Sequence, residues 1–215
     1  MNNYKAVIFD LDGTLLDTLE DLADAVNYTM REFGFPERSL DEVREFVGNG
    51  AKKLIELSMP DASDAVIASQ CLEVFKEYYF SNSKVKTRPY DGIIGLLETL
   101  RANGYKTAVV TNKPDDAAKE TVKHFFGELI DFTVGQIDGV PQKPEPDCVY
   151  TALEKLGVSK EETVFAGDSE VDCITALNAG LDCIGVTWGF RSREVLEEHG
   201  ARYITDKVDD VYGIV

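Results

Sequence analysis

The sequence YKAVIFDLDGTLLD occupies Tyr4–Asp17. It begins with a short run of apolar, β-branched and aromatic residues, Tyr4–Phe9, and such a run predicts a buried β-strand. The strand leads directly into Asp10-Leu11-Asp12-Gly13-Thr14. An N-cap for the next helix would require one small polar side chain, not two carboxylates followed by Gly-Thr. The segment therefore predicts a strand whose end carries a functional site.

Similar apolar runs recur along the chain, and helical patterns lie between most of them. The strand-like runs are Tyr105–Val110, Asp131–Val134, Thr163–Ala166 and Asp182–Thr187. The helical patterns are Gly92–Ala102, Pro114–Phe126 (with Pro114 as its first helical residue) and Pro146–Leu156. Strands that alternate with helices predict a parallel sheet, because each crossover places a helix against one face of it. The expected fold is α/β, a doubly wound, Rossmann-like parallel sheet.

One segment breaks this alternation, because it contains helical patterns and no strand-like run. Its patterns are Leu19–Phe33, a helix opened by the capping box Ser39–Glu42, Ala51–Ser58 and Ala62–Tyr79. We therefore expect an all-helical cap domain, residues 15–86, inserted into an α/β core domain formed by residues 1–14 and 87–215.

The composition limits the classes of partner. The formal net charge of −17 argues against a nucleic-acid partner or an anionic membrane surface, because both would be repelled. The four cysteines are scattered, no signal-peptide pattern follows Met1, and the apolar stretches are too short to span a membrane. We expect a cytoplasmic protein, a monomer or small homo-oligomer, with a small-molecule partner. An anionic substrate would need local positive charge from lysine, backbone N–H groups or a metal.

Polar side chains follow several of the predicted strands. The candidates are Asp10 and Asp12, Thr111 and Asn112, and Asp168 with Asp172 one helical turn further on; Lys143 joins them from a proline-punctuated loop, residues 143–147, that leads into a helix. Because the carboxyl ends of parallel strands meet at one edge of the sheet, we expect these groups to converge there. Four clustered carboxylates repel one another unless a cation lies among them. Oxygen ligands without histidine or cysteine favour Mg²⁺.

These residues carry a resemblance to a known family. The segment Asp10–Asp17 resembles the first motif of the haloacid dehalogenase-like superfamily of phosphohydrolases. Thr111-Asn112 resembles the second motif, Lys143 the third and Gly167–Asp172 the fourth, in the same order and at fitting spacings. The helical insert occupies the place of that superfamily's first-position cap. The resemblance covers essentially the whole chain and implies a phosphatase.

The residue types allow a role to be assigned to each group in such a reaction. A carboxylate at Asp10 can attack phosphorus and form an aspartyl phosphate. Asp12 is placed to protonate the leaving alcohol and then to deprotonate water. Mg²⁺ held by Asp10, Asp168 and the Asp12 carbonyl would offset phosphoryl charge, together with Lys143 and the Thr111 hydroxyl. Further expected contributors are Asp172 as a metal-site or neighbouring carboxylate, and Leu11 and Asn112 as phosphate-binding residues.

The expected substrate comes from the cap. The segment Val47–Ala51 resembles the cap loop of phosphoglycolate phosphatases, with Gly48, Asn49 and Gly50 as candidate substrate-binding residues; it also fits a simple helix-to-helix turn. The tail Gly185–Phe190 resembles the same group, although Trp188 and Phe190 are assigned to packing or to the surface. The resemblance implies 2-phosphoglycolate as substrate. A pyrophosphatase or nucleotidase of the superfamily would use the same core residues, and a phosphohexose mutase or a non-catalytic phosphate-binding scaffold is a further alternative.

Overall fold

The computed structural model describes residues 4–60 and 64–215 of the chain. The chain divides into two compact units, one formed by Met1–Leu16 and Pro89–Val215 and the other by Asp17–Arg88. Both divisions fall two residues later than the boundaries expected from the sequence. The first does so because Leu15 and Leu16 are buried in the core of the first unit.

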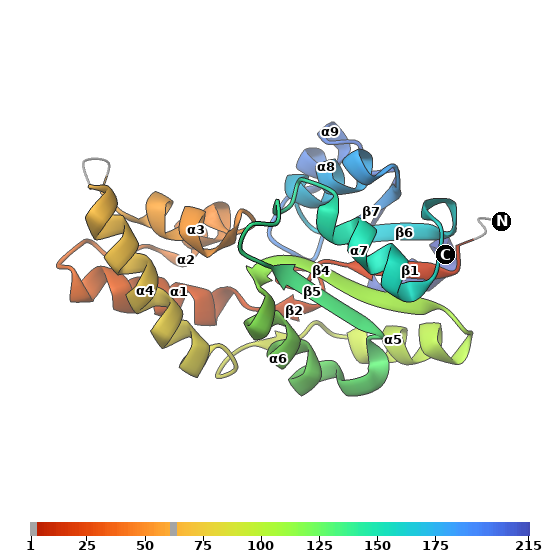
Figure 1. The fold of residues 1–215 in the computed structure, drawn as a ribbon, viewed down its shortest axis with the longest axis horizontal. Coiled ribbons are helices and arrows are strands. Elements are labelled where there is room, and N and C mark those ends of the chain that lie inside the picture. Colours follow the sequence, from red (N-terminus) through yellow and green to blue (C-terminus); the bar gives the residue numbers. More distant parts are fainter. Residues whose placement is uncertain (1–3, 61–63) are drawn as a thin grey trace. The chain divides into compact units, whose positions relative to one another are not determined.

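The first unit contains a parallel sheet of six strands among the described residues (Figure 1). The strands are β1 (Ala6–Phe9), β4 (Lys106–Pro114), β5 (Phe132–Gln136), β6 (Thr163–Gly167), β7 (Asp182–Val186) and β8 (Tyr203–Thr205). Their order across the sheet is β5-β4-β1-β6-β7-β8, and every neighbouring pair is parallel. The strand order therefore reverses at β1, which is where sheets of this type bind ligands.

Helices cover both faces of this sheet. They are α5 (Ile93–Ala102), α6 (Asp115–Phe126), α7 (Asp147–Leu156), α8 (Glu170–Ala179), α9 (Arg193–Glu198) and α10 (Val208–Ile214), with the short 3₁₀ turns η1 (Gly127–Leu129) and η2 (Lys160–Glu162). Alternate residues of β1 enter two separate cores. Val7 and Phe9 pack in the core that includes α5, α6 and α10, and Ile8 packs in the core that includes α7, α8 and α9. The prediction of a doubly wound parallel sheet is confirmed.

The sequence reading missed some strand residues. β8 was not predicted, because its three residues are too few for an apolar pattern to be visible. β4 extends past the predicted Val110 to Pro114, which lies opposite Gln136 of β5. Pro114 is therefore the last residue of a strand, and α6 begins one residue later than predicted.

The second unit contains four helices among its described residues. They are α1 (Leu19–Glu32), α2 (Leu40–Phe46), α3 (Gly50–Ser58) and α4 (Ala65–Asn82). The predicted capping box is present, since Ser39 accepts a hydrogen bond from the Glu42 N–H and the Glu42 carboxylate accepts one from the Ser39 N–H. Tyr28 of α1 stacks on Tyr78 of α4 with ring centroids 4.2 Å apart. The predicted start of the last helix at Ala62 lies outside the described residues.

A buried carboxylate closes this helical unit. Asp21 of α1 is 3% exposed and accepts hydrogen bonds from the N–H groups of three successive residues in the returning segment, Val85, Lys86 and Thr87. Because these bonds join residues more than sixty positions apart, they hold the end of the unit against its first helix. The short strands β2 (Leu16–Asp17) and β3 (Arg88–Pro89) pair with each other, and they contain the first and last residues of this unit. Within residues 4–60 and 64–215, no helix combines the length and apolarity needed to cross a membrane.

Candidate active site

The loop after β1 is a tight turn anchored to the sheet. The Asp10 N–H donates to the Ala166 carbonyl of β6 at 2.9 Å, and the Leu11 carbonyl accepts from the N–H groups of Leu15 and Leu16 at 3.0 Å each. Gly13 has φ +91°, a conformation that other residues rarely adopt, and its N–H donates to the Leu16 carbonyl at 2.8 Å. The turn thus fixes Asp10 at the carboxyl end of the central strand.

Lys143 lies between two carboxylates. Its side chain is 2% exposed, and its Nζ is 2.9 Å from Asp10 Oδ1 and 2.7 Å from Asp172 Oδ1. Burial alone would lower the pKa of Lys143, but the charges of Asp10 and Asp172 raise it above its usual value. The ammonium therefore stays charged beside the candidate nucleophile. The other Asp172 oxygen, Oδ2, accepts from the N–H and hydroxyl of Ser169 at 3.0 and 2.6 Å.

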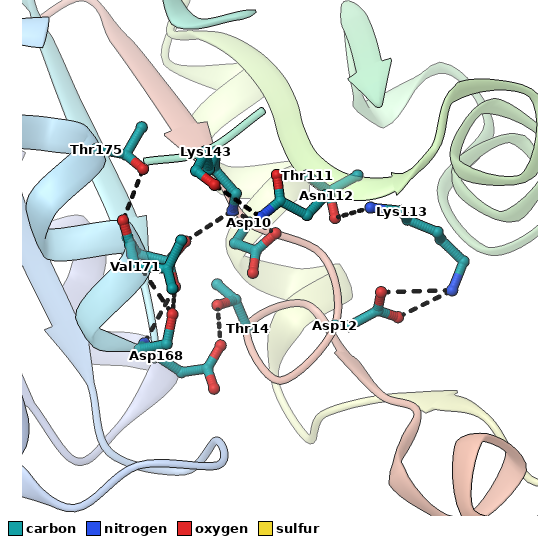
Figure 2. Close-up of polar contacts among 12 residues, drawn as sticks. Asp10, Asp12, Thr14, Thr111, Asn112, Lys113, Lys143, Asp168, Val171 and Thr175 are labelled. Carbon is teal, nitrogen blue, oxygen red and sulfur yellow. Dashed lines mark hydrogen bonds and ion pairs between the residues drawn. The ribbon is translucent and has the colours of Figure 1, made fainter. Parts of the chain in front are cut away.

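Asp168 follows β6 and is held from two sides. Thr14 Oγ1 donates to its Oδ1 at 2.8 Å, and the Phe190 N–H donates to its Oδ2 at 2.9 Å (Figure 2 shows the Thr14 contact). The side chain is 1% exposed. Burial, and then the charges of Asp172 and Asp10, raise the pKa of Asp168 well above its usual range.

The carboxylates of Asp10, Asp168 and Asp172 form a group that fits a divalent cation. One oxygen from each lies within 4.8 Å of the others, and all three residues are buried. Burial raises the pKa of Asp10 to about 7, although Lys143 opposes that rise. Asp10 Oδ1 accepts no hydrogen bond of normal geometry from the described residues, even though the Lys143 ammonium is 2.9 Å away. A hard cation with oxygen ligands would satisfy that oxygen and relieve the repulsion.

Asp12 does not belong to this carboxylate group, which corrects the expectation of four clustered carboxylates. Its side chain points away from Asp10 toward Lys113 (Figure 2). The Lys113 Nζ lies 3.1 and 3.4 Å from the two Asp12 oxygens, and the lysine side chain is 3% exposed. The sequence reading missed Lys113, although a lysine directly after Thr111-Asn112 in a strongly acidic chain was a usable signal.

The remaining core candidates lie in the same unit and differ in what their side chains contact. Thr111 is 4% exposed, and its hydroxyl accepts from the Lys113 N–H at 3.3 Å. The Asn112 side-chain amide donates to the Lys143 carbonyl at 3.1 Å, so it joins the end of β4 to the lysine-bearing loop. Leu11 packs its side chain in the hydrophobic core, which leaves only its backbone for a phosphate contact. Phosphate binding by these residues stays a prediction.

The candidate cap residues lie where the chain turns from α2 into α3 of the helical unit, and Gly50 is the first residue of α3. Gly48 and Gly50 have φ values of +123° and +81°, so the segment is a turn that requires glycine, as the simpler interpretation predicted. Asn49 precedes α3. Substrate contacts of Gly48, Asn49 and Gly50 stay predictions.

Comparison with known proteins identifies the family. Residues 7–186, most of the chain, match the haloacid dehalogenase-like hydrolases. The chain belongs to this family. Its relatives include a phosphoglycolate phosphatase of Pseudomonas putida, 33% identical over 217 residues, covering 94% of this chain and 76% of the relative. A phosphoglycolate phosphatase of Vibrio cholerae is 32% identical over 227 residues, covering 100% of this chain and 98% of the relative. The predicted membership of the superfamily, with a likeness to phosphoglycolate phosphatases, is confirmed.

The likeness extends to solved structures. A candidate phosphoglycolate phosphatase of Lactobacillus delbrueckii subsp. bulgaricus superposes with a TM-score of 0.93 at 36% identity, covering 99% of this chain and 98% of that one. CbbY from Rhodobacter sphaeroides, crystallised in complex with phosphate, gives a TM-score of 0.78 at 26% identity, covering 95% and 94%.

Proposed function

We propose that this hydrolase is a Mg²⁺-dependent phosphatase that cleaves a small phosphate monoester through an aspartyl phosphate on Asp10. The observation that carries the proposal is the placement of Asp10. Its carboxylate lies at the carboxyl end of the central strand, 2.9 Å from a buried lysine and within a group of three carboxylates. The net charge of −17 would otherwise repel a phosphate. Binding therefore needs the positive charge of Lys143 and of the cation that the carboxylate group would hold.

Each step of the proposed reaction has a residue in the α/β unit. The Asp10 carboxylate attacks phosphorus and forms the acyl phosphate, and the alcohol leaves with a proton from Asp12. Asp12 then takes a proton from the water that hydrolyses the acyl phosphate. Lys143 and Thr111 donate to the phosphoryl oxygens. Mg²⁺, when bound, supplies further positive charge toward the phosphoryl group.

The residues that would hold Mg²⁺ are Asp10, Asp168 and the backbone carbonyl of Asp12. Asp172 is part of the same carboxylate group, but its oxygens are already bonded to Lys143 and Ser169. We therefore assign Asp172 to fixing the lysine beside Asp10 rather than to direct metal ligation.

The proposed substrate is 2-phosphoglycolate, because the relatives from Pseudomonas putida and Vibrio cholerae, which span most of this chain, are phosphoglycolate phosphatases. The test is a panel of phosphate esters compared by kcat/KM: 2-phosphoglycolate, pyrophosphate, nucleoside monophosphates and hexose phosphates. We expect the highest kcat/KM for 2-phosphoglycolate. A higher kcat/KM for pyrophosphate would make the protein a pyrophosphatase, and a higher kcat/KM for a nucleoside monophosphate would make it a nucleotidase. No phosphate release from any ester would favour a non-catalytic scaffold.

The carboxylate group also predicts how Mg²⁺ stabilises the fold at different pH values. In the metal-free protein, burial raises the pKa of Asp10 to about 7 and that of Asp168 well above its usual range. A carboxyl with a raised folded-state pKa stabilises the fold fully below its unfolded pKa, and this contribution is lost as pH rises through the folded pKa. With chelator present, Tm should therefore fall as pH rises from about 4, the ordinary pKa of a carboxyl, through about 7, the folded-state pKa of Asp10.

Added Mg²⁺ should reverse this trend, because it binds the ionised carboxylates of the folded state. The difference in Tm between Mg²⁺ and chelator should consequently grow with pH, as measured by thermal unfolding in parallel buffers. In the same samples, chelator should stop turnover and Mg²⁺ restore it. A Tm difference that is flat with pH, or turnover that is indifferent to chelator, would remove the metal from the proposal.

A further inference from the structure

The segment after β7, Thr187–Phe190, lies against the candidate site although no catalytic step uses it. It carries the single tryptophan of the chain. The Trp188 Nε1 donates to the Thr14 carbonyl at 3.0 Å, and the Phe190 N–H donates to Asp168 Oδ2 at 2.9 Å. Both residues are half-buried, and Trp188 packs against the core. The expectation of packing or surface positions for these residues did not include the polar contacts.

The glycine between them fills a space that no other residue could occupy. A Cβ on Gly189 would lie 2.3 Å from the Asp168 Cβ and 2.4 Å from the Gly13 carbonyl oxygen. Real Cβ atoms essentially never make contacts this short, and the obstacles are backbone and the first side-chain carbon, which cannot swing aside. From the opposite side, a Cβ on Gly13 would lie 2.4 Å from Asp168 Oδ2. The two glycines therefore allow two backbone segments to enclose one carboxylate.

The enclosed carboxylate keeps ligand capacity. Each carboxylate offers about four lone-pair directions, and the hydrogen bonds from Thr14 and Phe190 use one on each oxygen of Asp168. Hydrogen bonds of this kind fix the orientation of a carboxylate without occupying it. The bond from Trp188 to the Thr14 carbonyl acts on Asp168 indirectly, because it holds Thr14, whose hydroxyl donates to Asp168 Oδ1.

We propose that Trp188, Gly189 and Phe190 form a positioning segment that fixes the Asp168 carboxylate for a divalent cation. This inference rests on the proposed function, because it needs Asp168 to be a metal ligand. The segment is distant in sequence from the strand ends that carry the reaction, and it acts through Asp168 and not on the substrate.

The test is the affinity of purified protein for Mg²⁺, measured by isothermal titration calorimetry. Gly189→Ala should weaken Mg²⁺ binding by roughly 10- to 100-fold, the usual scale for losing a group that orients a metal ligand. The matched control is Gly95→Ala, since a Cβ at this position in α5 meets no atom within 4 Å. It should bind Mg²⁺ as the unmodified chain does. In turnover assays, the rate of Gly189→Ala should recover at high Mg²⁺, which a generally damaged fold would not allow.

Trp188→Phe provides a second test if Gly189→Ala fails to fold. It retains an aromatic ring but removes the bond to Thr14, so Mg²⁺ affinity should fall by roughly 2- to 10-fold, equivalent to one net hydrogen bond. In the unmodified chain, Trp188 fluorescence should change on Mg²⁺ addition, and Gly189→Ala should need more Mg²⁺ for the same change. Unaltered affinity in a folded Gly189→Ala and in Trp188→Phe would overturn the positioning role alone. An unmodified chain that binds no Mg²⁺ would overturn the metal proposal itself.

Discussion

Asp10→Asn is expected to reduce turnover by on the order of 10⁴–10⁶-fold, the scale observed when a covalent nucleophile is removed. An amide at this position cannot attack phosphorus at a useful rate, although its shape is nearly unchanged. The fold should persist, because the substitution removes one of three crowded carboxylates and leaves Lys143 paired with Asp172. The measurement is steady-state phosphate release, with thermal unfolding in chelator as the check on folding.

The control is Asp210→Asn, which makes the same chemical change at an exposed position on α10. Its turnover should match that of the unmodified chain. Acid quenching during turnover, followed by peptide mass spectrometry, should find a phosphoryl group on the peptide containing Asp10 and none in the variant. Substantial phosphate release by a folded Asp10→Asn protein would eliminate the nucleophile role and with it the proposed mechanism.

The sheet and its functional edge were predictable because their signals are local. The apolar run Ala6–Phe9 is buried on both sides of a parallel sheet, so its composition alone distinguishes it from the amphipathic helices. Residues at the ends of such strands must share an edge, and this topological rule brings Asp10 and Asp168 together without any knowledge of side-chain packing. The family resemblance then added roles that the spacing could not supply.

The orientations of side chains within the edge were not predictable. Asp12 and Asp10 are two residues apart, yet a turn with one left-handed glycine sends Asp12 toward Lys113 and away from the carboxylate group. The contact between the Phe190 N–H and Asp168 depends on a backbone group, which leaves no trace in residue type. Asp17 pairs with Arg88, and the neighbouring Thr18 is the N-cap residue of α1. The orientations and partners of these side chains are decided by long-range packing.

Asp12→Asn is expected to lower kcat/KM for an alkyl phosphate by roughly 10²–10⁴-fold, the range for losing an acid–base group. The kcat/KM for p-nitrophenyl phosphate should fall much less. Its leaving group departs without a proton, and kcat/KM reports only the steps through phosphoryl transfer to Asp10. The measurement is kcat/KM for both esters in the variant, the unmodified chain and Asp210→Asn.

The structure supplies a competing explanation that the same experiment separates. Asp12 is the carboxylate that lies beside the buried ammonium of Lys113, and an amide in its place would leave that ammonium without this opposite charge. Damage of this kind would disturb the site for every substrate, so both esters would lose activity by the same factor and the Tm of the variant would fall. A loss confined to the alkyl ester, with Tm preserved, requires proton donation. Equal losses would instead make Asp12 a structural partner of Lys113 and leave the acid to be found elsewhere.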